Sequence, residues 1–122
     1  MSFEKGVIKK LALEYEALSL HLLAMNDNIK DLMEPFQQKH YVTPSMNGSY
    51  SIKYVLPALV PEMKEAYKEL DGVQNGSEAM SAFTNMLKLD SVEKEKMRKA
   101  LLAYCKLDTL AMVRVLEKLR KL

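Results

Sequence analysis

The sequence predicts a mostly α-helical fold with at most one or two short strands. Apolar residues recur at spacings of three and four along much of the chain, which is the period of an α-helix. The residues from Ser91 to Leu122 also contain neither glycine nor proline. A chain of 122 residues can bury a modest core. We therefore expect residues 1–122 to form a single domain or a fragment of one.

The N-terminal third predicts one helix followed by less regular chain. Residues 3–27 form an amphipathic pattern that Gly6 weakens locally. Residues 28–36 predict a brief strand or a helical turn that Pro35 stops. Residues 37–50 are the least regular part, and the Asn47-Gly48 pair is a turn signal.

The middle of the chain predicts two short helices separated by a proline. Residues 51–61 indicate a helix that Pro57 limits, because proline interrupts the hydrogen-bond ladder. Residues 61–70 predict a second helix, with Pro61 in the favoured first turn.

The last part of the chain carries two helix-start signals. Ser77 is suited to cap a helix over residues 78–89. Asp90 and Glu93 form a capping-box pattern that begins the final segment. That segment is either one long helix or two helices with a joint between residues 104 and 108.

Composition excludes few functions. A net charge of +2 does not argue for nucleic acid or an anionic membrane, although a local basic cluster can still bind nucleic acid. The single cysteine, Cys105, rules out an internal disulfide, and we expect it to be a small buried residue. No apolar run approaches the roughly 20 residues of a membrane span. We expect a soluble, cytoplasmic protein without a membrane partner.

Asp108 is the unusual residue of the final segment. On a helical wheel it lies within about 20° of Leu101 and Val115, inside an apolar stripe. An unpaired carboxylate buried there would cost several kcal/mol. Three interpretations remain open: Asp108 caps a helix beginning near Thr109, it pairs with a lysine or arginine in the core, or it faces a cleft and binds a metal ion.

Tyr104 and Asp108 form a Y-x-x-x-D pattern that resembles the third motif of DEDD-type, RNase H-like 3′–5′ exonucleases. The segments "NGSYSIKYVLPALVPE", "NGSEAM" and "LLAYCKLDTLAMVRVLEKL" also look like the C-terminal domain of a bacterial family of uncharacterised proteins with this pattern. The resemblance covers nearly the whole chain. It implies that residues 1–122 are the helical C-terminal portion of an RNase H-like α/β nuclease domain.

The N-terminal segment "SFEKGVIKKLA" looks like the second exonuclease motif without its beginning, which makes Glu4 the carboxylate of that motif. The first motif, D-x-E, occurs nowhere in the sequence. We therefore expect the chain to be the C-terminal part of a longer protein.

The resemblance implies metal-dependent hydrolysis of nucleic-acid phosphodiesters with Mg²⁺ or Mn²⁺ in the full-length parent. Asp108 and Glu4 would be metal ligands, and Tyr104 would position the attacking water. Because the D-x-E motif is absent, we expect this chain alone to be inactive. Nucleic acid is then a partner through the parent protein.

The stretch "NGSYSIK" is a second candidate site. Ser49, Ser51 and backbone amides at a helix start are suited to hold a substrate phosphate, with Lys53 supplying charge. The alternative is an ordinary turn followed by a helix cap.

A non-catalytic helical interaction module is the alternative to the nuclease hypothesis. In a fragment cut from a larger domain, exposed apolar faces favour association. A homodimer formed through such faces is the partner expected under this hypothesis.

Overall fold

The computed structural model describes residues 2–122, and all regular secondary structure in that range is helical. The mostly α-helical prediction is confirmed. The α-helices are α1 (Ser2–Glu14), α2 (Ser19–Asn28), α3 (Glu34–Gln37), α4 (Ile52–Leu59), α5 (Gly76–Met86) and α6 (Ser91–Leu119). Short 3-10 turns cover Glu16–Leu18, Pro44–Met46 and Pro61–Met63. The chain divides into two compact units, with the boundary after Glu34.

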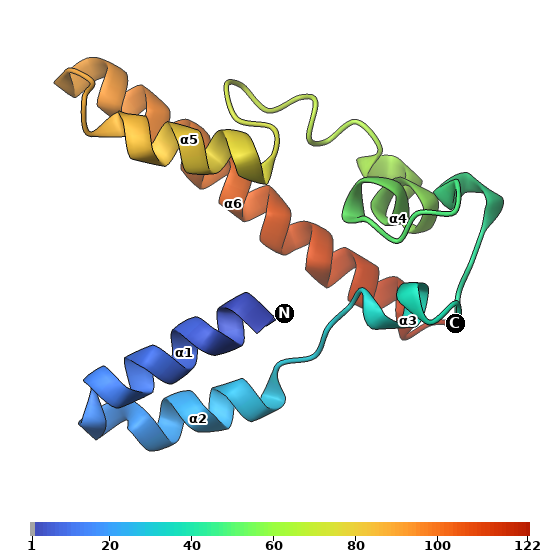
Figure 1. The fold of residues 1–122 in the computed structure, drawn as a ribbon. Coiled ribbons are helices and arrows are strands. Elements are labelled where there is room, and N and C mark those ends of the chain that lie inside the picture. Colours follow the sequence, from blue (N-terminus) through green and yellow to red (C-terminus); the bar gives the residue numbers. More distant parts are fainter. Residues whose placement is uncertain (1) are drawn as a thin grey trace. The chain divides into compact units, whose positions relative to one another are not determined.

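The N-terminal unit is a helical hairpin rather than the single helix expected over residues 3–27. The backbone leaves the helical region at Tyr15, where φ is −113° and ψ is 78°. α2 then folds back along α1 (Figure 1). Ala12 is buried, and the Asn26 side chain donates a hydrogen bond to the Lys5 carbonyl at 3.3 Å. The reversal places α2 alongside α1, and Ala12 and Asn26 are the buried residues among those described in this unit.

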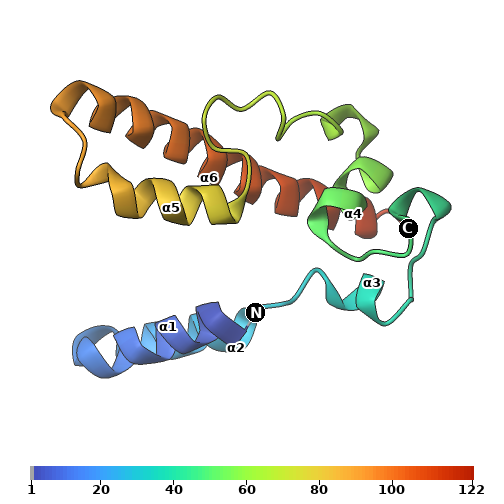
Figure 2. The ribbon, with the colours of Figure 1, turned by 45° about the horizontal axis from the view of Figure 1, so that its top comes forward.

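The C-terminal unit, Pro35–Leu122, is organised around α6. α5 runs antiparallel along the first half of α6, and α4 packs against the second half (Figures 1 and 2). α6 is continuous, so the alternative of a joint between residues 104 and 108 is wrong. Asp90 begins the helix as expected: its carboxylate accepts hydrogen bonds from the Val92 and Glu93 amides at 2.9 Å.

The core of this unit lies between α4 and the second half of α6. Its buried members are apolar side chains from four segments: Phe36, Met46, Val55, Leu56, Leu59, Val60, Ala111 and Val115. Pro57 lies inside α4 without ending it. Phe36 belongs to the helical turn α3, so the strand alternative for residues 28–36 is wrong.

Residues 61–70 form a 3-10 turn and further turns instead of the expected helix. Their backbone hydrogen bonds mostly join residues three apart, such as the Lys68 amide to the Glu65 carbonyl at 2.9 Å. Tyr67 from this segment packs against the core and bonds to α6, so tertiary contacts override the local helix preference.

The start of α5 also differs from the prediction. Asn75, rather than Ser77, is the N-cap: its side-chain oxygen accepts a hydrogen bond from the Glu78 amide at 3.0 Å. The Glu78 carboxylate in turn accepts a hydrogen bond from the Gln74 amide at 2.7 Å. This reciprocal pair holds the loop before α5 in place. Among the described helices, none is both long and apolar enough to cross a bilayer.

The packing of α4 on α6 predicts a large cost for truncating Leu56, which is 1% exposed. Leu56→Ala should lower the free energy of unfolding by about 2–5 kcal/mol, through lost burial and the cavity left behind. Urea denaturation followed by circular dichroism measures this change. Leu122→Ala, at a side chain that is 75% exposed, is the control and should change stability by less than about 0.5 kcal/mol. Equal effects of the two substitutions would contradict the placement of the core.

Candidate functional site

A pocket of about 360 Å³ lies in the C-terminal unit where four segments meet. The starts of α4 and α5, the turn segment before α5 and the middle of α6 all contribute to its wall. Its lining residues are Ile52, Lys53, Lys64, Tyr67, Lys68, Gln74, Asn75, Gly76, Tyr104 and Asp108. Three sequence-predicted site residues, Lys53, Tyr104 and Asp108, are therefore brought together here.

Asp108 is partly buried in this wall, and its partner is a tyrosine. The Tyr67 hydroxyl donates a hydrogen bond to Asp108 Oδ1 at 2.9 Å. The helix-cap interpretation of Asp108 is wrong, because α6 runs through this position without a break. Within the described residues Asp108 also forms no ion pair with a lysine or arginine. The carboxylate faces a pocket, as the third interpretation requires, and metal binding there stays a prediction.

The two tyrosines of the pocket lie beside each other and beside this carboxylate. The ring centroids of Tyr67 and Tyr104 are 6.3 Å apart, with an angle of 53° between the ring planes. Burial, followed by the hydrogen bond to Asp108, raises the pKa of Tyr67 well above its ordinary value. Burial, followed by the nearby Asp108 charge, also raises the pKa of Tyr104. Both phenols are therefore neutral donors at physiological pH.

The lysines give the pocket an excess of positive charge. Lys68 forms an ion pair with Glu65 at 2.8 Å, and this hydrogen bond is the main reason that the pKa of Glu65 lies below its ordinary value. Lys53 and Lys64 form no such pair with any residue that the structure describes. Asp108 is the only carboxylate among the residues that line the pocket.

Ser49 and Ser51 serve the local backbone and are not part of the pocket wall. The Ser49 hydroxyl oxygen accepts a hydrogen bond from the Ser51 amide at 3.2 Å. Ser51 is the N-cap of α4, and its side-chain oxygen accepts from the Lys53 amide at 3.4 Å. The turn-and-cap alternative for this stretch describes these contacts, and a phosphate role for the two serines stays a prediction.

Glu4 lies in the first turn of α1, in the N-terminal unit, so neither unit by itself brings it together with Asp108. Within residues 2–122 no group of three or more histidine, cysteine, aspartate or glutamate side chains is arranged to hold a metal ion. Cys105 is exposed with a free thiol, contrary to the expected burial, because it lies beside the apolar face of α6 rather than on it.

Sequence reasoning missed Tyr67 and Lys64. Both lie in residues 61–70, which the pattern marked as a helix without any site. A signal was present: positions 64, 67 and 68 are spaced three and four apart, so Lys64, Tyr67 and Lys68 share one side in a helical or near-helical turn. Nothing in the sequence indicates that this side turns toward Asp108.

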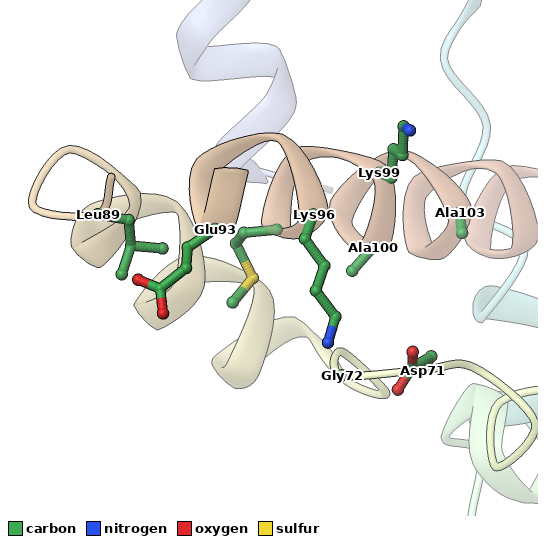
Figure 3. A pocket seen from close by; sticks show the side chains of 9 residues that line it. Asp71, Gly72, Leu89, Glu93, Lys96, Lys99, Ala100 and Ala103 are labelled. Atoms are coloured by element: carbon green, nitrogen blue, oxygen red, sulfur yellow. The ribbon is translucent and has the colours of Figure 1, made fainter. Parts of the chain in front are cut away.

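A larger hollow of about 640 Å³ lies along the first half of α6 and contains none of the predicted site residues. Figure 3 shows the Lys96 side chain extending toward the turn at Asp71 and Gly72, with Ala100 and Ala103 along the helix. The charged residues that line it are Asp71, Glu93 and two lysines. No aromatic or nucleophilic side chain is among its lining residues. The smaller pocket is therefore the better candidate.

The contact between Tyr67 and Asp108 predicts a pH-dependent contribution to stability. Because folding raises the pKa of Tyr67 above the unfolded value of about 10, the contribution is complete below pH 10 and is lost as pH rises through the folded pKa. Tyr67→Phe should lower the free energy of unfolding by about 1 kcal/mol at pH 7 and flatten its decline at alkaline pH.

Urea denaturation at pH 7, 9 and 11 measures both effects. Tyr50→Phe, at an exposed ring, is the matched control and should leave the free energy of unfolding at pH 7 unchanged. If Tyr67→Phe behaves like this control, the hydrogen bond contributes nothing to folding.

Comparison with known proteins gives one family match, and it lies outside the pocket. The model of a domain of unknown function (DUF2779) matches residues 1–51, which is less than half of the 122-residue chain. The matched segment includes Glu4, Ser49 and Ser51 and ends before Tyr104 and Asp108. No curated protein and no solved structure matches the chain. In its N-terminal part, the chain is therefore similar to a family of uncharacterised domains.

Proposed function

We propose that this chain is the C-terminal part of a metal-dependent DEDD-type 3′–5′ nuclease and that it contributes Tyr104 and Asp108 to the active site. The observation that supports the proposal most directly is the shared pocket. Asp108 and Tyr104 line it together with Lys53, Lys64 and Lys68. Positive charge around a carboxylate and a phenol suits the approach of a phosphodiester.

The described residues do not make up a complete metal site. The pocket offers one carboxylate among three lysines, and two divalent ions need several carboxylates between them. Mg²⁺ or Mn²⁺, when bound in the full protein, would activate water and stabilise the leaving oxygen. The remaining ligands would have to come from side chains outside this pocket. The chain alone is therefore expected to be inactive.

The residues of this chain have separate roles under the proposal. Asp108 lines the pocket, and its Oδ1 accepts the hydrogen bond of Tyr67, which restricts the orientation of the carboxylate. Tyr104 is four residues earlier, one turn along the same face of α6. Its neutral hydroxyl is suited to position a water molecule by hydrogen bonding.

The test uses the complete product of the gene, a 5′-labelled single-stranded 30-mer and Mn²⁺. Asp108→Asn should lower kcat by at least about a hundredfold, and Tyr104→Phe should lower it by roughly a hundredfold. Asp71→Asn changes an exposed carboxylate outside the pocket and should leave kcat unchanged. Full activity in Asp108→Asn, or no cleavage by the unaltered gene product, would reject the nuclease proposal.

An exposed apolar face on α5 favours a second candidate, the helical interaction module. Met80, Phe83 and Leu87 are spaced three and four apart and are 76%, 65% and 78% exposed. An exposed apolar stripe of this kind is typical of an association surface. The occupant proposed here is a second copy of the chain.

Sedimentation equilibrium at protein concentrations of roughly 5 to 200 µM tests the dimer, because a weak dimer forms and dissociates within this range. The unaltered chain should show a mass above that of one copy, and Phe83→Ser/Leu87→Ser should shift it to the monomer, because it removes apolar area from the face. Leu122→Ser, at an exposed C-terminal side chain, is the control and should not change the mass. A monomeric unaltered chain throughout this range would reject the homodimer.

A further inference from the structure

The pocket around Asp108 carries more positive than negative charge, which suits an anion. Lys53, Lys64 and Lys68 line it, whereas Asp108 is its one lining carboxylate. The Glu65 carboxylate is paired with Lys68, so Lys53 and Lys64 are the two pocket lysines that form no ion pair with a described residue. One oxygen of Asp108 also has a partner, because Oδ1 accepts a hydrogen bond from the Tyr67 hydroxyl.

Two helix N-termini add to this preference. The first residues of α4, Ile52 and Lys53, line the pocket, and so do the N-cap Asn75 and the first residue, Gly76, of α5. A helix N-terminus carries a partial positive charge from its aligned peptide dipoles. Both therefore favour an anion in the pocket that the three lysines also line.

Two tyrosine rings also line the pocket. Tyr67 and Tyr104 are partly buried, and their rings are 6.3 Å apart. A cationic wall beside aromatic rings is the combination that binds the phosphate and the base of a nucleotide together. The volume of about 360 Å³ lies within the range of small-molecule sites.

From this arrangement we infer that the pocket binds a nucleotide unit, with its phosphate on Lys53 and Lys64 and its base against Tyr67 and Tyr104. The inference rests on the proposed function, because it names the substrate class that the same pocket would bind. It requires no metal ion. The nucleotide is either free or the end of a nucleic-acid strand, and the phosphate and base chemistry is shared by both.

The experiment measures metal-free binding of two probes to the 122-residue chain, in EDTA. The probes are fluorescein-labelled dT12, followed by anisotropy, and unlabelled dTMP, followed by calorimetry. Lys53→Gln/Lys64→Gln should raise the Kd for dT12 by roughly tenfold or more. The slope of log Kd against log salt concentration should fall by about 0.7 for each lysine.

Two further variants make the result specific. Lys94→Gln/Lys106→Gln removes the same charge from exposed positions on α6 outside the pocket, and should change the Kd by less than about twofold. Lys53→Arg/Lys64→Arg keeps the charge and should retain binding. Circular dichroism and thermal melting of each variant show that the fold is intact.

Lysine-dependent binding of both probes would identify a site for a single nucleotide, and binding of dT12 alone would identify a site on a strand. Three results would overturn the inference: no binding of either probe, equal weakening by the control pair, or a Kd unchanged by the Lys53→Gln/Lys64→Gln pair.

The outcome also separates this inference from the proposed function. Asp108→Asn should not weaken metal-free binding, since it removes a negative charge from the pocket; a loss as large as that of the lysine pair would overturn the inference. Lysine-dependent binding without any cleavage by the complete gene product would support the pocket and reject the nuclease. Cleavage that depends on Asp108 but has an unchanged KM in the lysine pair would reject the pocket and retain the nuclease.

Discussion

The rotation of α6 about its own axis is the constraint on which the candidate site depends. Ala111 and Val115 are 0% and 1% exposed and form the core with α4. Asp108 lies three positions before Ala111, and Tyr104 lies four positions before Asp108, so all four residues lie on one face of the helix. Burial of the core residues therefore turns Asp108 toward the inside of the unit. A rotation that exposed Asp108 would expose Val115 as well.

The hydrogen bond between Tyr67 and Asp108 offsets part of the free-energy cost of burying this carboxylate. A carboxylate loses hydration when it is partly buried, and a donor at 2.9 Å replaces some of it. The same contact joins a segment of turns to α6 across 41 positions of sequence. Beyond Pro61 at its start, residues 61–70 contain no proline or glycine, and the irregular backbone there accompanies the contact of Tyr67 with α6.

Charge in this chain is organised locally, and the net charge of +2 conceals it. Lys53, Lys64 and Lys68 come from two segments and meet around one carboxylate. On α6, two arginines pair with glutamates three positions away, as Arg114 does with Glu117 at 2.9 Å. Exposed pairs of this kind contribute little to stability. The pocket differs because three of its lining residues are lysines and only one is a carboxylate.

The sequence by itself determined the helical class, the start of α6 at Asp90 and the place of Asp108 on an apolar stripe. These features depend on residues close together in the chain, through helical spacing and a local cap. Tertiary structure alone decided that α1 and α2 separate at Tyr15, that residues 61–70 are turns and that Tyr67 is the partner of Asp108. Sequence spacing cannot indicate which donor a distant segment will bring, because that is settled by how α4, α5 and α6 pack around a shared core.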